Sequence, residues 1–271
     1  MRFAVVGHIE WVEFARVDRV PLPGEIIHAR EGWDEPAGGG AVAAVQIARL
    51  AGSCDFFTAV GDDEIGRRAV EQLTGLGVRV HASVRDRPTR RAFTYVDDSG
   101  ERTITTIGER IAPHLEDSLP WWALSACDAV LFVAGDAGAL RTARLAKVLT
   151  AVSRVLPVLR EGGVVLDALV GSAHDPGEAF ADDDLDPRPR VLVRTEGSAG
   201  GVAEPGGRFP ATELPGPLVD AYGCGDAFVA GLTYGLGAGL HRDEALGLAA
   251  RCGAAALTGR GAYAGQLRLA R

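Results

Sequence analysis

An acidic residue in a glycine-rich segment is the feature of this sequence best suited to chemistry. The segment, residues 220–228, reads Asp-Ala-Tyr-Gly-Cys-Gly-Asp-Ala-Phe, and an apolar run rich in small residues follows it. Gly223 and Gly225 allow backbone amides to converge where a helical pattern begins, at Asp226, and such a point attracts anions. A carboxylate there adds little to folding, so we interpret Asp226 as a general base beside a phosphate group. A glycine-rich turn capped by an aspartate fits this segment equally well.

Length and charge limit the class of protein. The 271 residues, 47% of them hydrophobic, can form one large α/β domain with a sizeable core. The net charge of −8 argues against nucleic acid or an anionic membrane surface as the main partner. The apolar run 3–6 is too short for a signal peptide, and no span of 18 apolar residues follows. We therefore expect a cytoplasmic protein.

Two residue types exclude familiar motifs. Lys147 is the only lysine, so a P-loop of the form GxxxxGK[ST] is impossible. Cys54, Cys127, Cys224 and Cys252 stand singly and form no CxxC motif, which fits neither a zinc site nor a disulfide framework. We expect four free thiols, three of them in the core.

Short apolar runs alternate with longer helical patterns along the chain. Such alternation predicts the α/β class: a mostly parallel sheet with helices on both faces. The expected strands are 3–6, 56–60, 129–133, 164–166 and 191–193, and the expected helices are 41–50, 66–76, 140–159 and 243–257.

Two segments, about 8–33 and 88–108, break this alternation. The first alternates polar and apolar residues at 25–29, and the second reads as a hairpin with its turn at 97–100. Neither contains a helical pattern. They predict a small second sheet, which would be a lid over the main domain or an extension of the main sheet's edge.

Three further groups of residues are candidates for a site. Gly38, Gly39 and Gly40 directly precede a helix of small residues, where they would permit a ligand or another helix to approach closely. Asp167, at the expected end of a strand, and Glu178 are candidate Mg²⁺ ligands. A strand also runs into a glycine-rich turn that carries a hydroxyl group, with Thr195, Gly197 and Gly200.

The order and spacing of these segments resemble the ribokinase-like (PfkB) carbohydrate kinase family over nearly the whole chain. Residues 220–228 look like its signature D-T-x-G-A-G-D-x-F, and 38–40 like its amino-terminal glycine signature. Residues 58–66 are similar to its V-G-x-D-x-x-G segment, 100–103 match its G-E-R-T turn, and 195–200 resemble its nucleotide turn T-x-G-x-x-G.

The resemblance implies a single Rossmann-like kinase domain, residues 1–271, with a β lid formed by about 8–33 and 88–108. Its reaction would transfer the γ-phosphoryl group of ATP to a hydroxyl of a small sugar-like alcohol, with Mg²⁺ as cofactor and activation by a monovalent cation left open. Asp226 would be the base and would contact the acceptor, and the amides of Gly223, Cys224 and Gly225 would form an anion hole. The other implied contacts are Thr195, Gly197, Gly200, Gly261 and Ala262 for ATP and Glu10, Gly38, Gly39 and Gly40 for the acceptor.

The chain departs from the family pattern at the acceptor and metal positions. Val12 stands nearest the place where the family commonly has an aspartate, and Val42 replaces its sugar-binding asparagine. The Mg²⁺-associated N-x-x-E motif is missing, and Glu178 would replace its acid. The identity of the acceptor is therefore open.

The sequence is also compatible with three other functions or assemblies. A nucleoside acceptor would fit if Trp11 and Trp33 stacked on a base, whereas packing within the lid is the simpler role for both. A non-catalytic sugar- or nucleotide-binding module would keep the fold without needing Asp226. An exposed lid edge would also permit a homodimer.

Overall fold

The computed structural model describes residues 1–269, and its main feature is one large sheet. The strands of this sheet are Phe3–Val6 (β1), Cys54–Gly61 (β4), Val78–Arg85 (β5), Ala129–Phe132 (β8), Val148–Val152 (β9), Ala168–Ser172 (β10), Leu192–Thr195 (β11), Gly201–Glu204 (β12) and Gly207–Phe209 (β13). Their order is β13-β12-β11-β10-β9-β8-β1-β4-β5. The seven strands β11, β10, β9, β8, β1, β4 and β5 pair in parallel, each with the next one in this order. Strands β12 and β13 add an antiparallel edge. The predicted mostly parallel sheet is confirmed.

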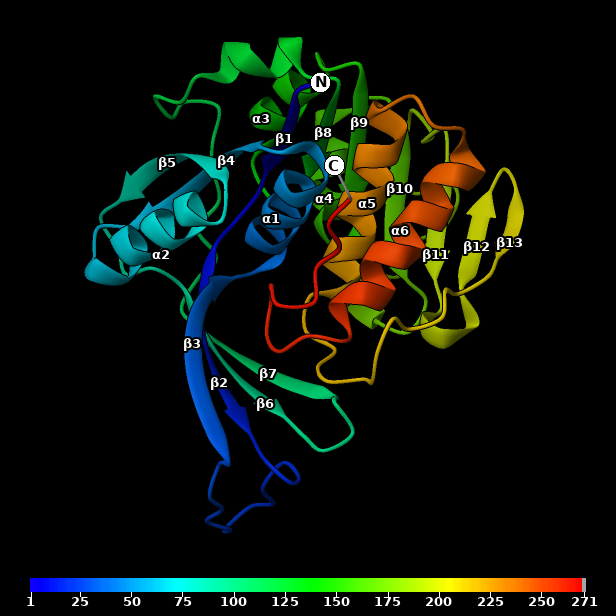
Figure 1. The fold of residues 1–271 in the computed structure, drawn as a ribbon. Helices are drawn as coiled ribbons and strands as arrows, with labels where there is room; N and C mark the ends of the chain where they lie inside the picture. Colours follow the sequence, from blue (N-terminus) through cyan, green and yellow to red (C-terminus); the bar gives the residue numbers. More distant parts are fainter. Residues whose placement is uncertain (270–271) are drawn as a thin grey trace.

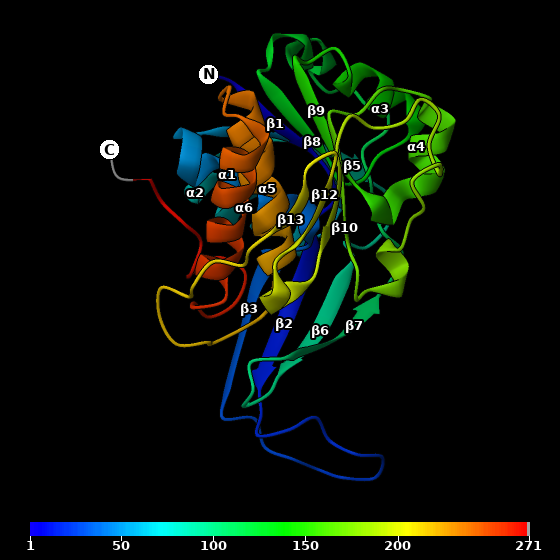
Figure 2. The same ribbon diagram turned by 90° about the vertical axis from the view of Figure 1, so that its right-hand side faces the viewer.

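Helices cover both faces of this sheet, as predicted (Figures 1 and 2). The helices are Gly39–Ala51 (α1), Glu64–Gly75 (α2), Ala137–Ala143 (α3), Leu156–Gly162 (α4), Cys224–Gly237 (α5) and Arg242–Ala256 (α6). Figure 2 shows α1, α2, α5 and α6 on one side and α3 and α4 on the other. Glycines allow α5 and α6 to pack closely, since a Cβ on Gly231 would lie 2.8 Å from Cys252 Sγ.

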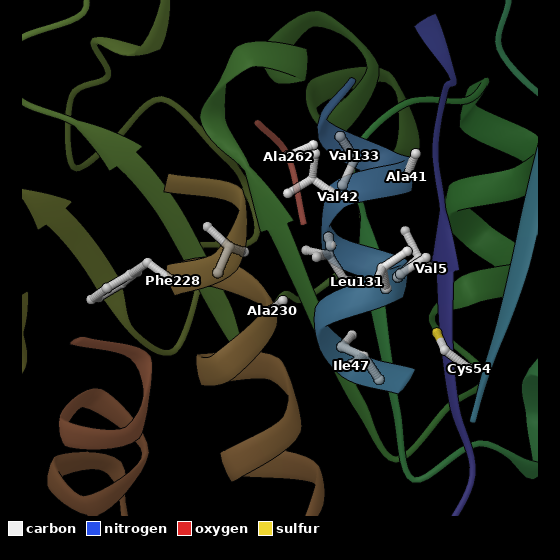
Figure 3. Close-up of a cluster of buried hydrophobic side chains, with 14 of the residues drawn as sticks. Val5, Ala41, Val42, Ile47, Cys54, Leu131, Val133, Phe228, Ala230 and Ala262 are labelled. Carbon is white, nitrogen blue, oxygen red and sulfur yellow. The ribbon is translucent and has the colours of Figure 1, made fainter. Parts of the chain in front are cut away.

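Apolar side chains fill the space on both sides of the strands. Val5 and Leu131 pack with Val42, Ile47 and Ala230 of α1 and α5 in the cluster that Figure 3 shows. A second cluster lies under α3 and α4. Because both faces of the central strands are buried, their sequences read as continuous apolar runs rather than as alternating ones.

A separate small sheet extends from the carboxyl ends of the parallel strands (Figure 1). Its strands are Glu10–Arg16 (β2), Glu31–Ala37 (β3), Arg91–Val96 (β6) and Arg102–Ile107 (β7), in the order β3-β2-β6-β7. We call this sheet the lid. The predicted second sheet and its hairpin are confirmed, whereas the alternative of an extended main-sheet edge is wrong. Residues 25–29, which showed an alternating pattern, lie in a loop and not in a strand.

Two predicted elements are wrong. The expected helix 140–159 is interrupted by strand β9, whose β-branched and apolar residues pair with β8 and β10. The expected strand 164–166 is not a strand, because β10 begins at Ala168. In both places the pairing with neighbouring strands, which local sequence does not encode, determined the backbone conformation. No helix among the described residues is long and apolar enough to cross a membrane.

Candidate active site

The glycine-rich segment forms the amino end of helix α5. Gly223 has φ 75°, a left-handed conformation that glycine adopts without strain. A Cβ at this position would also lie 2.9 Å from Cγ1 of Val42. The helix begins at Cys224, so the amides of Cys224 and Gly225 belong to its first turn, where amides lack intrahelical partners. The backbone thus presents the amides expected of an anion hole.

Asp226 lies in the same turn and meets the amino end of a second helix. A Cβ on Gly39, the first residue of α1, would lie 2.7 Å from Asp226 Oδ1. Gly38, with φ 84°, precedes that helix, and its amide donates to the Tyr222 hydroxyl at 3.3 Å. Two helix amino ends therefore converge on one carboxylate, and their dipoles favour negative charge between them.

The surroundings of Asp226 make it a better base than an ordinary aspartate. Burial is the main cause that raises the pKa of Asp226 to about 6, and the negative charge of Glu178 adds to the shift. The guanidinium groups of Arg102 and Arg154 oppose it. A carboxylate with this pKa is ionised at neutral pH and accepts a proton more readily than one near 4, which suits general base catalysis.

Asp220 stabilises the glycine-rich segment through hydrogen bonds to backbone amides. Its carboxylate is completely buried and accepts hydrogen bonds from the amides of Tyr222 at 2.8 Å and Gly261 at 2.9 Å. Burial raises the pKa of Asp220, and the two amides partly offset that rise. Asp220 therefore joins the start of the signature to the loop after α6.

Glu178 follows strand β10, and its negative charge acts on Asp226. Its carboxylate accepts from the Ser172 amide and from the Arg154 guanidinium, each at 2.8 Å. Arg154 also donates to Asp175 at 2.5 Å. No group of three or more metal-binding side chains occurs within residues 1–269. Mg²⁺ commonly takes only one or two carboxylates and completes its shell with water and substrate phosphates, so Glu178 fits such a role.

Asp167 is not part of this site, contrary to the prediction. It precedes β10 and therefore lies at the amino edge of the sheet, opposite the carboxyl ends. Its carboxylate oxygens are occupied by Arg144 at 2.7 Å, Arg190 at 3.1 Å and the Leu149 amide at 2.8 Å. The prediction placed it wrongly because the strand was expected to end, not begin, next to this residue.

Thr195, Gly197 and Gly200 lie at the carboxyl end of strand β11, as expected for a nucleotide turn. Gly197 has φ 59° and open space around its Cα, which leaves room for a ligand. Gly200 has φ 84°, and a Cβ there would collide with the backbone of Phe209. The first glycine thus leaves space and the second permits a tight turn.

Gly261 and Ala262 lie against lid strand β3. The Ala262 amide donates to Glu35 at 2.7 Å, and Ala262 is 2% exposed. The Tyr263 hydroxyl donates to the carbonyl of Pro36, which is also a residue of β3. The structure thus connects this loop to the lid, and contact of these residues with adenine stays a prediction.

Glu10 lies beside Gly38, and His8 lies beside both Gly38 and Gly40. A Cβ on Gly38 would lie 3.2 Å from Glu10 Cγ and 3.2 Å from the His8 ring, and one on Gly40 would meet the His8 backbone. Arg90 pairs with Glu10 at 3.1 Å. Burial raises the pKa of Glu10, and the guanidinium of Arg90 partly offsets the shift.

Sequence reasoning missed the arginines of this site: Arg90, Arg102, Arg110 and Arg154. Arg154 follows β9, which was predicted as part of a helix, so its place at a strand's carboxyl end was hidden. A correctly assigned strand would have revealed it. Arg90 and Arg102 belong to the hairpin segment and Arg110 follows it, so the positions of all three depend on the packing of the lid.

Comparison with known proteins agrees with this geometry. The model of the pfkB family of carbohydrate kinases matches residues 2–160 and 166–268. The chain belongs to the PfkB family. It is therefore a carbohydrate kinase, a phosphotransferase with an alcohol group as acceptor. A fructokinase of Salmonella typhimurium is 31% identical over 267 residues, which cover 84% of this chain and 87% of that one.

Solved structures of other kinases share the fold of this PfkB chain. A microbiome-derived acarbose kinase has a TM-score of 0.83 at 22% identity, over 98% of this chain and 96% of that one. A ribokinase of Thermotoga maritima has a TM-score of 0.74 at 22% identity, over 96% and 94%. At such identities the likeness shows the fold, which is ribokinase-like with a β lid.

Proposed function

We propose that this kinase transfers the γ-phosphoryl group of ATP to a hydroxyl of a small sugar-like alcohol, with Asp226 as base. The new bond joins the acceptor oxygen to the γ-phosphorus, the bond between that phosphorus and the leaving ADP oxygen breaks, and the hydroxyl proton goes to Asp226. The amides of Gly223, Cys224 and Gly225 stabilise the negative charge of the moving group. The observation that carries the proposal is the convergence of two helix amino ends at Asp226.

The remaining contacts follow from the layout of the site. Thr195, Gly197 and Gly200 contact ATP, with Gly261 and Ala262 near its adenine. Mg²⁺ is held by Glu178, water and the phosphates, and supplies charge neutralisation. Two ribokinases of this fold, from Cryptococcus neoformans and Arabidopsis thaliana, are complexes with ADP and with ribose and ATP, which supports ATP as donor.

The acceptor contacts lie on the opposite side of Asp226. Gly38, Gly39 and Gly40 allow the acceptor to approach the backbone, and Glu10 is the nearest carboxylate that can orient it. A nucleoside acceptor receives no support from the tryptophans, because Trp11 is 2% exposed and Trp33 stacks on Phe14 with ring centroids 4.8 Å apart. Both rings therefore serve the packing of the lid, and a sugar is the favoured acceptor.

An assay of ADP release with Mg²⁺ tests this proposal. Ribose, fructose, adenosine and cytidine serve as acceptors, and Asp226→Ala should lower kcat by about four orders of magnitude with ATP affinity retained. Asp98→Ala, an exposed aspartate of the lid turn, is the matched control. Turnover of nucleosides alone would exclude a sugar acceptor. ATP binding without transfer to any acceptor would favour the non-catalytic binding module.

We also propose one kinase domain over residues 1–271, with the lid formed by about 8–33 and 88–108, that pairs with a second copy through the lid. Strand β7 is the edge of the small sheet, and its residues are exposed, including Ile104 and Ile107 at 42% and 50%. An open, partly apolar edge strand favours pairing with another strand. Sedimentation would show a dimer that Ile104→Lys dissociates; a wild-type monomer at all concentrations would exclude this pairing.

A further inference from the structure

Three guanidinium groups converge on the acceptor side of the site. Arg90, Arg110 and Arg154 all act electrostatically on the same two side chains, His8 and Glu10. They come from three separate parts of the chain: the residue before β6, the segment after β7 and the turn after β9. The convergence is thus a product of the tertiary fold and not of local sequence.

The available carboxylates do not pair with all three arginines. Arg154 donates to Asp175 and Glu178. Arg90 pairs with Glu10, but its Nε is buried without a hydrogen-bond partner, and its side chain is only 13% exposed. Arg110 has no hydrogen bond or ion pair within the described part of the chain. The buried Nε of Arg90 and the exposed guanidinium of Arg110 therefore have no acceptor from the described part of the protein, and water can reach only the second.

The guanidinium groups of Arg90, Arg110 and Arg154 repel one another. Burial and the charges of Arg90 and Arg154 lower the pKa of Arg110, whereas Glu10 alone opposes their repulsion. Burial and the charges of these arginines lower the pKa of His8, which disfavours its positive form, and its Nδ1 is buried without a partner. Hydroxyl groups of a neutral sugar need no such charges, while planar guanidinium groups match carboxylate and phosphate oxygens in pairs.

We propose that the acceptor is an anionic sugar derivative, whose carboxylate or phosphate group binds Arg110 and the free edge of Arg90 while its reacting hydroxyl faces Asp226. This inference rests on the proposed function. Glu10 holds Arg90 in place and can accept from a hydroxyl of the same ligand. The replacement of polar residues by Val12 and Val42 fits an acceptor that is recognised by charge at one end.

Two classes of compound carry an anionic group that these arginines could bind: sugar acids and sugar phosphates. Matched pairs distinguish them: glucose with gluconate, and fructose with fructose 6-phosphate, assayed by ADP release with Mg²⁺. We expect kcat/KM for the anionic member of a pair to exceed that of its neutral partner by about tenfold or more, the effect of one charge-assisted hydrogen bond. Preference for gluconate would indicate a sugar acid, and preference for fructose 6-phosphate a sugar phosphate. Equal or better use of the neutral members would overturn the inference and leave the proposed function intact.

Substitution of Arg110 tests whether this residue binds the anionic group of the acceptor. Because Arg110 is exposed, Arg110→Gln should fold normally. It should raise KM for the anionic acceptor about ten- to hundredfold, with little effect on neutral sugars, and Arg110→Lys should restore part of the loss. Arg30→Gln, just before lid strand β3 and paired with Asp98, is the control. An equal effect on neutral and anionic acceptors would overturn the inference.

Direct binding separates the two proposals. Calorimetric titration of gluconate and fructose 6-phosphate into wild type and Arg110→Gln requires no turnover. If no acceptor is phosphorylated, the proposed function fails, while binding that Arg110→Gln abolishes would still support anion recognition. If neither probe binds, or if both proteins bind equally, the anion inference fails whatever the assay shows.

Discussion

Gly39 and Asp226 face each other across the amino ends of α1 and α5, so closely that a Cβ on Gly39 would lie 2.7 Å from Asp226 Oδ1. Any side chain at position 39 must therefore move the carboxylate or the helix that carries it. A base has to stay within hydrogen-bond reach of the hydroxyl that it deprotonates. The glycine thus determines where the proposed base can lie.

Gly39→Ala should displace this carboxylate and lower kcat/KM by about a hundredfold, the usual effect of moving a catalytic group by about 1 Å. Steady-state kinetics would measure it. Gly247→Ala is the matched control, because Gly247 lies within α6 with nothing near its Cα. That control should be about 0.5–1 kcal/mol more stable with unchanged kinetics. Full activity of Gly39→Ala would contradict the assigned contact.

Asp226→Asn should stabilise the fold above pH 6. The pKa of Asp226 is raised from 3.8 in the unfolded chain to about 6 in the folded one, so the folded state binds the proton more tightly. Wild-type stability therefore falls as the pH rises from about 4 to about 6, by roughly 3 kcal/mol at about 1.4 kcal/mol per unit. Asparagine removes this cost.

Urea unfolding at several pH values would measure the difference. The stability gain of Asp226→Asn should grow between about pH 4 and pH 6 and then level off. A constant difference across this range would mean that the carboxylate of Asp226 carries no burial cost.

The same pKa predicts the acid limb of the rate profile. Since the base must be ionised, kcat/KM should rise about tenfold per pH unit below about 6 and reach a plateau above it. Initial rates between pH 4.5 and 8 with subsaturating acceptor would measure this limb. A flat profile over that range would argue against Asp226 as the base.

Glu178→Gln should affect both metal use and the pKa of the base. Loss of a proposed Mg²⁺ ligand raises the Mg²⁺ concentration for half-maximal rate, by about tenfold for one carboxylate. Because the charge of Glu178 raises the pKa of Asp226, its removal should shift the acid limb to lower pH. Glu161→Gln, an exposed residue of α4, is the control. If neither quantity changed, Glu178 would have no role beyond its hydrogen bonds with Ser172 and Arg154.

The fold class and the small second sheet were predictable because they depend on patterns that the chain carries locally. Apolar runs marked the buried strands, and the hairpin turn at 97–100 marked the small sheet, whereas its role as a lid came from the family resemblance. The errors at 140–159 and 164–166 arose where an apolar run suits helix and strand about equally. A strand's carboxyl end is defined only once the strand itself is placed. The errors therefore put Asp167 at the wrong edge of the sheet and hid the position of Arg154.

The sequence by itself determined the chemistry proposed for residues 220–226, because Gly223, Gly225 and Asp226 act through backbone freedom and spacing within one turn. It also determined the family, through the order of its motifs. Only the tertiary structure decided which residues from distant segments face that turn. It brought Gly39 against Asp226, joined Gly261 to Asp220, and gathered three arginines around Glu10. Such contacts depend on how helices and sheets pack, because each partner is specified by its place in the fold and not by its neighbours in the chain.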